Sequence, residues 1–259
     1  MAEPAAAPVV VLHGVRKAFE TGTLALDGFD FALRASEFVS LLGPSGCGKS
    51  TALRILAGLS EPSGGTVTWR DPAARNGIGF VFQEPTLMPW ATVFDNVFLP
   101  LKLAGESRAA VRDRVMQTLS RVGLSDFASA YPRELSGGMR MRVSIARALV
   151  TAPRILLMDE PFAALDEITR FKLNDDLVAL WRELKMTVVF VTHSVFESVY
   201  LSNRIVVMTG RPGRVSSELL IDAPDRDARF RTSADYAGYC RVASEALAKA
   251  MQPRAGAAA

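Results

Sequence analysis

The sequence has little of what marks a secreted, membrane-spanning or nucleic-acid-binding chain. Only two cysteines occur in 259 residues, Cys47 and Cys240, far apart in the chain. This excludes a disulfide framework and favours a reducing compartment. No apolar run approaches the roughly 18–20 residues of a membrane span, and we expect no secretion signal, because the first residues lack a basic start and a long apolar stretch. The formal net charge of +3 is too small to argue for nucleic acid or charged lipid as a partner.

A phosphate-binding pattern, G-x-x-x-x-G-K-[ST], stands between an apolar run at 38–42, which predicts a buried strand, and a run at 52–57, which predicts a helix. Glycines let the backbone approach a triphosphate, and the N–H groups at the helix start favour negative charge. Lys49 can reach the β- and γ-phosphates, and the Ser50 hydroxyl can ligate Mg²⁺. The predicted nucleotide-binding residues of this P-loop are Gly43, Ser45, Gly46, Cys47, Gly48, Lys49, Ser50 and Thr51.

A second helix start with the same chemistry lies further along the chain. Ser136 can cap the helical run at 142–149 and donate its hydroxyl, and Gly137 and Gly138 expose N–H groups. Together with the P-loop, this motif resembles the signature of the ATP-binding cassette (ABC) family. The resemblance implies that Ser136, Gly137 and Gly138 act on the nucleotide of a partner cassette. That partner would be a second copy of the chain or a paralogue, in a head-to-tail dimer.

An apolar strand at 155–158 ends in two carboxylates, Asp159 and Glu160. Buried parallel strands carry function at their carboxyl ends. By resemblance to the family's Walker B strand, Asp159 holds Mg²⁺, and Glu160 orients or deprotonates the attacking water.

Four more residues match family motifs in the family's order. Gln83, after a strand-like run at 78–82, matches the Q-loop glutamine, which implies Mg²⁺ ligation and a catalytic role; alone, it would be read as a polar residue that ends a strand. Asp166 matches the D-loop, and His193 matches the switch histidine that contacts the γ-phosphate. Phe19 resembles the aromatic residue that stacks on adenine, and the alternative is a core residue of an N-terminal sheet.

The segment after Gln83 is broken by two prolines and supplies large apolar side chains, Leu87, Met88 and Trp90. In ABC cassettes this region contacts the membrane permease, and exposed apolar groups often mark an interface. The alternative is that Trp90 packs inside a helical subdomain.

Three features resemble the nitrate, sulfonate and taurine importer branch of the family. They are the sequence Leu-Met-Pro-Trp at residues 87–90, the sequence Arg-Pro-Gly-Arg at residues 211–214, and Met139 in place of the commoner glutamine at the end of the signature. The resemblance implies a small anionic or heteroaromatic solute such as nitrate, a sulfonate, taurine or a pyrimidine precursor. The chain does not encode the solute's identity, because a cassette never touches it.

The predicted fold class is α/β, with strands expected at 9–12, 29–33, 38–42, 66–69, 78–82, 155–158, 187–191, 205–208 and 214–220. The family implies a P-loop NTPase core with a mainly parallel sheet, an antiparallel N-terminal β subdomain and an inserted helical subdomain at about 90–150. Periodicity predicts a helix over 107–122 within that insertion. We expect a flexible tail at 1–8, one cassette domain at 9–224, and a helical extension with a disordered tail at 225–259.

These patterns predict an ATPase subunit that uses ATP and Mg²⁺ to energise an ABC importer at the cytoplasmic face of the inner membrane. Its expected partners are another cassette, permease subunits and, indirectly, an extracytoplasmic solute-binding protein; no nucleic acid is expected. The alternative is a soluble ABC ATPase that remodels a protein or nucleic-acid complex. The sequence contains no internal repeat, which counts against the tandem-cassette proteins of that second class.

Overall fold

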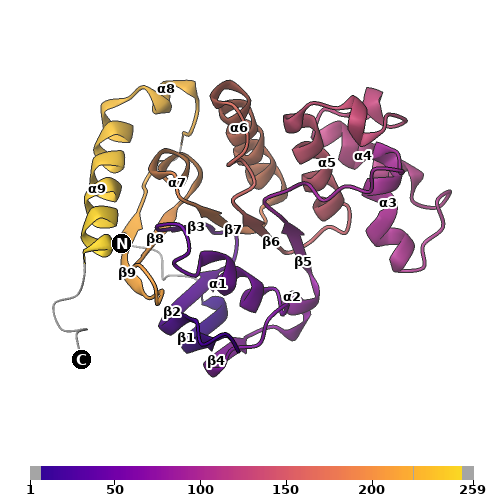
Figure 1. Cartoon of the computed structure of the whole chain (residues 1–259). Coiled ribbons are helices and arrows are strands. Elements are labelled where there is room, and N and C mark those ends of the chain that lie inside the picture. Colours follow the sequence, from indigo (N-terminus) through magenta and orange to yellow (C-terminus); the bar gives the residue numbers. More distant parts are fainter. Residues whose placement is uncertain (1–6, 224, 253–259) are drawn as a thin grey trace. The chain divides into compact units, whose positions relative to one another are not determined.

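A computed structural model describes residues 7–223 and 225–252 of the chain (Figure 1). The chain divides into two units, the first formed by residues 1–71 and 189–259 and the second by residues 72–188. Residues 1–6 and 253–259, which belong to the predicted tails, lie outside the described residues.

An antiparallel three-stranded sheet opens the first unit, in the order β2-β1-β4. Alternate residues of β2, including Phe29, Phe31 and Leu33, are buried, as expected for a strand with one face on the core. The strands are β1 (Pro8–Ala18), β2 (Leu24–Arg34) and β4 (Gly64–Trp69).

The other sheet of the first unit has the order β7-β3-β8-β9. Strands β3 and β8 run parallel, and β8 and β9 form an antiparallel hairpin. Every residue of β3, β7 and β8 is buried, which explains their continuous apolar runs. The strands are β3 (Phe38–Leu42), β7 (Thr187–Thr192, of which the last four residues belong to this unit), β8 (Arg204–Met208) and β9 (Val215–Leu220).

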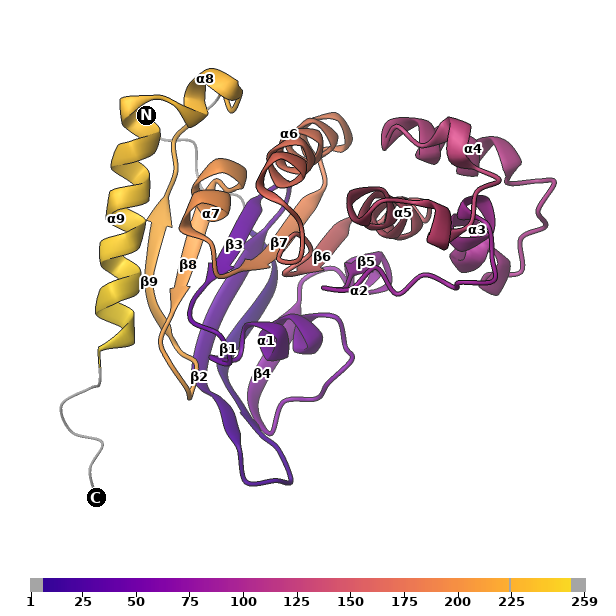
Figure 2. The ribbon, with the colours of Figure 1, turned by 45° about the horizontal axis from the view of Figure 1, so that its top comes forward.

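Helices of the first unit follow the strands of this sheet. Figures 1 and 2 both show the yellow C-terminal helix α9 running alongside β9, and α9 also packs on α7 and β8. The helices are α1 (Lys49–Leu56), α7 (Val195–Leu201), α8 (Ala228–Arg231) and α9 (Ala234–Met251).

The second unit pairs β5 (Ile78–Val81) with β6 (Ile155–Asp159) in parallel. Helix α3 packs against α5 and α4, and these three helices gather at one end of the unit in both views (Figures 1 and 2). The helices are α2 (Pro72–Asn76), α3 (Val93–Leu103), α4 (Arg112–Arg121), α5 (Gly137–Leu149) and α6 (Glu167–Leu184), with 3₁₀ turns η1 (Ser125–Phe127) and η2 (Pro132–Glu134).

The predicted α/β class is confirmed, and each expected strand is present, although β1 ends six residues later and β2 begins five residues earlier than predicted. The helix predicted over 107–122 is wrong in its first turn, because α4 begins only at Arg112. There the Ser107 hydroxyl accepts a hydrogen bond from the Ala110 N–H at 3.3 Å. Residues 108–111 form a turn, and the Arg108 guanidinium there pairs with Asp95 of α3, so a tertiary contact and not the helical periodicity decides the path of this segment.

A buried cation links both sheets of the first unit. Arg204 on β8 is only 2 % exposed. Its guanidinium donates to both carboxylate oxygens of Glu37, at 2.6 and 2.9 Å, to Glu218 on β9 at 2.9 Å, and to the Ala32 carbonyl of β2 at 2.6 Å. Burial works to lower the pKa of Arg204, but the hydrogen bond and charge of Glu37 outweigh it, and the pKa is raised. The charge therefore persists in the core.

Arg204→Met should lower the free energy of unfolding by about 3 kcal/mol, because it leaves the Glu37 carboxylate buried without its main partner. Urea denaturation measures this loss. Adding Glu37→Gln should recover part of the lost stability, because the buried carboxylate charge that has no partner is then removed. A loss below about 1 kcal/mol, typical of surface ion pairs, would contradict the role assigned to this network.

Candidate nucleotide-binding and hydrolysis site

The predicted P-loop connects β3 to α1 in the first unit. Gly46 and Gly48 adopt left-handed backbone conformations, with φ of 74° and 105°. Such residues, alternating with right-handed ones, turn successive N–H groups toward one concavity, which binds anions. Ser45 and Gly46 are exposed, so the loop's tip is open to solvent.

The loop is packed so closely that a side chain at either of two positions would clash. A Cβ on Gly48 would lie 2.8 Å from the Ala25 carbonyl oxygen of β2 and 2.8 Å from Leu26 Cδ2. A Cβ on Gly43 would lie 2.9 Å from Cys47 Sγ. Gly48 is thus required by packing as well as by φ, and Gly43 is required by packing.

Lys49 is 3 % exposed, and its ammonium donates to the carbonyl oxygens of Gly43 at 2.9 Å and Pro44 at 3.0 Å. The Lys49 ammonium is therefore fixed against the backbone of the loop. A buried cation, a concave set of N–H groups and a helix N-terminus are together the chemistry that a triphosphate requires. The residues present fit that ligand.

Two further predicted residues belong to the first unit. Phe19 lies at the turn after β1 and is 43 % exposed, so the alternative that it is a core residue is wrong. The Lys17 ammonium lies 5.4 Å from its ring centroid. His193 is exposed and directly follows β7, and Ser194 then caps α7 by accepting the Glu197 N–H at 3.3 Å.

In the second unit, Asp159 ends β6 and is 7 % exposed, and Glu160 follows it in a left-handed conformation with φ of 45°. This conformation costs a non-glycine residue about 1–3 kcal/mol, and such strain is concentrated at functional sites. The chain turns sharply here, and the Ala163 N–H donates to the Glu160 carbonyl at 3.2 Å. The carboxylate thus stands at a strained turn beyond the buried strand.

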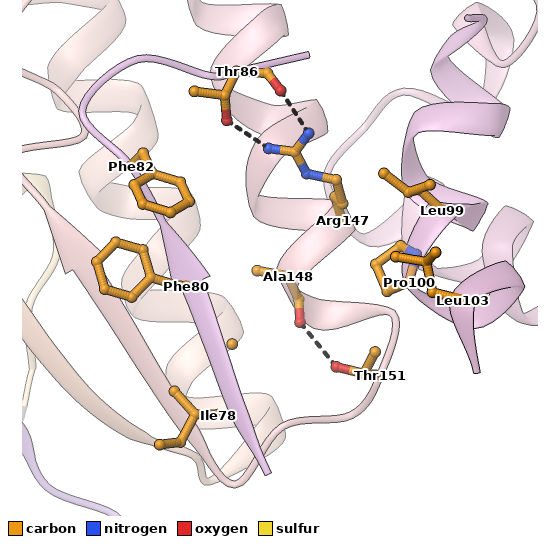
Figure 3. Close-up of a pocket in the computed structure, with 11 residues that line it drawn as sticks. Ile78, Phe80, Phe82, Thr86, Leu99, Pro100, Leu103, Arg147, Ala148 and Thr151 are labelled. Carbon is orange, nitrogen blue, oxygen red and sulfur yellow. Dashed lines mark hydrogen bonds between the residues drawn. The ribbon is translucent and has the colours of Figure 1, made fainter. Parts of the chain in front are cut away.

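Gln83 is exposed and begins a loop that two side chains hold in place. The Arg147 guanidinium, on α5, donates to the Pro85 carbonyl, the Thr86 carbonyl and the Thr86 hydroxyl at 2.8, 2.8 and 3.0 Å; Figure 3 shows the two contacts to Thr86. Fully buried Asn96 accepts the Met88 N–H at 2.8 Å. Its amide donates to the carbonyls of Met88, Ala91 and Thr92.

Sequence reasoning missed both Arg147 and Asn96. Asn96 lies within the apolar run of α3, where a polar residue without a partner would be costly. That mismatch was the available signal for Asn96. Arg147 gave no comparable signal, because its acceptors are carbonyl groups about sixty residues away.

The signature and the D-loop, both in the second unit, lie side by side. Ser136 caps α5 by accepting the Met139 N–H at 3.2 Å, and Asp166 caps α6 by accepting the Thr169 N–H at 2.9 Å. That N–H bond lowers the pKa of Asp166. A Cβ on Gly138 would lie only 2.6 Å from Thr169 Cγ2, and one on Gly137 would lie 3.4 Å from the Leu165 side chain. The two helix starts therefore pack in direct contact.

The predicted permease-contact residues differ in exposure. Trp90 is 76 % exposed, so the alternative that it packs inside the helical subdomain is wrong, whereas Leu87 and Met88 are half-buried. An apolar groove of about 390 Å³ lies in the same unit (Figure 3). Its lining includes none of the three predicted residues and comes from β5, the start of the loop, α3 and α5: Ile78, Gly79, Phe80, Phe82, Thr86, Leu99, Pro100, Leu103, Arg147, Ala148 and Thr151.

Two negative findings apply to residues 7–223 and 225–252. None of the helices there is long and apolar enough to cross a membrane. Within the same ranges, no group of three or more His, Cys, Asp or Glu side chains could hold a metal ion.

Comparison with known proteins gives a consistent result. The ABC transporter family model matches residues 26–163. An ATP-binding protein of Brucella abortus biovar 1 is 48 % identical over 222 residues, which are 83 % of this chain and 85 % of that protein. The taurine import ATP-binding protein TauB of Rhizobium johnstonii is 47 % identical over 203 residues, 76 % of this chain and 77 % of its own length. The dimeric structure of a bacterial ABC transporter cassette matches with a TM-score of 0.72 and 35 % identity, and covers 83 % of this chain and 99 % of that one.

The contact between Gly138 and Thr169 yields a test. Gly138→Ala should lower the free energy of unfolding by about 1–3 kcal/mol, because the new methyl group meets Thr169 Cγ2. Thr169→Ser removes that methyl and keeps the hydroxyl, so the double variant should regain most of the loss in thermal unfolding.

Gly238→Ala on α9 is the matched control, since nothing lies within 4 Å of a Cβ there. If Thr169→Ser failed to relieve Gly138→Ala, the helix starts would not be in the contact described.

Proposed function

The chain belongs to the ABC transporter family and is an ATP-binding ATPase of that family, and we propose that it energises a multi-subunit importer for a small organic sulfonate such as taurine. The observation that carries the nucleotide part of this proposal is the P-loop. Gly46 and Gly48 in left-handed conformations and buried Lys49 form a cradle suited to a triphosphate.

In the proposed reaction a water molecule attacks the γ-phosphorus of ATP. Glu160 accepts the water's proton as the bond between the γ-phosphorus and the bridging oxygen breaks, so that the γ-phosphoryl group passes from ATP to water and ADP leaves. Lys49 and the loop N–H groups bind the phosphates, His193 contacts the γ-phosphate, and Phe19 stacks on adenine. The remaining members of the proposed nucleotide site are Gly43, Ser45, Gly46, Cys47, Gly48, Ser50 and Thr51.

Mg²⁺ would be held by Ser50, Gln83 and Asp159. Their hydroxyl, amide and carboxylate oxygens are the hard donors that Mg²⁺ prefers, with phosphate and water oxygens completing its shell. The bound ion would neutralise charge on the β- and γ-phosphates.

The proposed working unit is a dimer of cassettes. One chain carries two phosphate-binding helix starts, at the P-loop and at the signature, and Ser136 is exposed rather than covered by its own unit. Ser136, Gly137, Gly138 and Asp166 then act on ATP held by the partner cassette. The dimeric form of a related cassette supports this arrangement.

The permease is proposed to dock in the groove of the second unit (Figure 3). Leu103 is 80 % exposed on its rim and Phe82 is 37 % exposed, and both adjoin the other apolar side chains of the lining, so that the exposed apolar surface is contiguous there. Arg147 lines the groove and holds Thr86, so an occupant would touch the element that carries Gln83. Leu87, Met88 and Trp90 extend the proposed contact surface.

A taurine importer subunit among the relatives supports a sulfonate as the solute class. The cassette would then lie at the cytoplasmic face of the inner membrane through its permease, with an extracytoplasmic binding protein delivering the solute. Measuring which solute that binding protein retains tests the solute separately from the ATPase.

Glu160→Gln tests the chemistry. The substitution keeps the shape and removes the base, so turnover should fall by about 10²–10⁴-fold while ATP still binds. The ATP-loaded variant should accumulate as a dimer in size-exclusion chromatography. Glu245→Gln, which changes an exposed carboxylate on α9, should leave turnover unchanged. Near-normal turnover in Glu160→Gln would show that another group is the base.

Leu103→Asp tests the docking groove. A charge on the rim should disfavour burial of an apolar partner surface and abolish co-purification with the permease. Basal ATPase turnover and the melting temperature of the isolated chain should stay near wild type, because Leu103 is exposed. Leu220→Asp makes the same change at a 75 % exposed leucine on β9 and should leave assembly intact. Normal assembly of Leu103→Asp would exclude the groove as the docking site.

A further inference from the structure

The Arg-Pro-Gly-Arg segment, residues 211–214, lies in the loop that joins β8 to β9 and has no part in the function proposed above (Figure 1). This loop is packed directly against the P-loop, within the first unit. Its contacts give each motif residue other than proline a physical reason to be there.

Gly213 lies directly against the backbone of the P-loop. A Cβ at this position would lie 2.1 Å from the Cys47 carbonyl oxygen, 3.0 Å from Met208 Cε and 3.2 Å from Leu26 Cδ2. The Gly213 N–H donates to the Ala25 carbonyl at 2.8 Å, which ties the loop to β2. The P-loop backbone is therefore held between β2 and Gly213, with no room for a methyl group.

Arg211 binds the P-loop from the solvent side. Its Nε donates to the Gly46 carbonyl oxygen at 3.1 Å, and its Nη2 lies 3.1 Å from where a Cβ on Gly46 would stand. In a trans peptide the carbonyl and the next N–H point in opposite directions. Fixing the Gly46 carbonyl toward Arg211 therefore directs the Cys47 N–H away from it, where the N–H donates a hydrogen bond to the Pro44 carbonyl oxygen at 3.3 Å and closes the turn of the loop.

Arg214 anchors the loop itself. Its guanidinium forms an ion pair with Asp27 of β2, and its backbone N–H donates to the Thr209 hydroxyl at 3.1 Å. The Thr209 N–H donates to the Arg214 carbonyl at 3.0 Å, which closes the loop. Arg211 therefore belongs to a loop whose backbone is itself fixed to β2.

We propose that the 211–214 loop is a positioning element of the nucleotide site, in which Arg211 sets the affinity for ATP by holding the Gly46–Cys47 peptide, and with it the turn closed by the Cys47–Pro44 hydrogen bond, in the shape that binds phosphate. Arg211 and Gly213 act through the P-loop and need not touch the nucleotide. This inference rests on the proposed P-loop site.

The test measures ATP affinity by calorimetry and steady-state ATPase kinetics on the purified full chain. Arg211→Ala should raise the Kd and KM for ATP about tenfold, the effect of losing one hydrogen bond from a charged donor. The kcat at saturating ATP should stay within about twofold, because bound phosphates then hold the loop. Arg211→Lys should recover much of the affinity, since an ammonium can also donate to the Gly46 carbonyl.

Two matched controls separate this role from general effects. Arg241→Ala removes the same charge from an exposed position on α9 and should leave the Kd unchanged. Gly213→Ala should raise the Kd for ATP, whereas Gly210→Ala, in the same loop with nothing within 4 Å of a Cβ, should not.

An unchanged Kd in Arg211→Ala, or an equal rise in Arg241→Ala, would overturn the inference. Lys49→Ala distinguishes it from the proposed site itself. If Lys49→Ala retained wild-type ATP affinity, the P-loop site would be wrong; if Lys49→Ala lost affinity and Arg211→Ala did not, only the positioning role would be wrong.

Discussion

The close packing of the phosphate loop against backbone from distant parts of the chain is the constraint on which the first unit depends. Gly48 lies against the Ala25 carbonyl of β2, and Gly213 lies against the Cys47 carbonyl. Neither contact leaves space for a Cβ. The conformation of the loop is therefore fixed by the positions of β2 and of the β8–β9 hairpin. Arg204 joins those elements through Glu37, Glu218 and Ala32, and a buried charge network thereby supports the elements that hold the proposed nucleotide-binding loop.

In the second unit the corresponding constraint is polar. Arg147 and Asn96 bind carbonyl groups of the loop that follows Gln83. The same helix, α5, begins at the signature serine and ends beside the apolar groove. Within this unit, one rigid helix therefore links three proposed activities: contact with a partner's nucleotide, support of the Gln83 loop and docking of the permease. Short helix–helix distances at Gly138 give α5 a definite position on α6.

Much of this could be predicted from local sequence. The apolar run before Gly43 and the helical run after Lys49 identify a strand–loop–helix unit, and the run ending at Asp159 identifies a buried strand. The helix expected from 107 was too long, because α4 begins at Arg112 and the residues before it form a turn that Arg108 ties to Asp95 of α3. The exposure of Phe19 and Trp90 agrees with their predicted places at the adenine end and in a contact surface, although an aromatic residue taken alone is equally typical of a core.

The sequence by itself determined the fold class, the order of the motifs and the membership of a family, because these depend on residue types at fixed local spacing. Only the tertiary structure decided what Arg147, Asn96, Arg211 and Gly213 do. Each of them acts on backbone groups, and a carbonyl oxygen has no residue-specific signature in the sequence. Arg211 and Gly46 are separated by 165 positions, and only the pairing of β3 with β8 brings them within one hydrogen bond of each other.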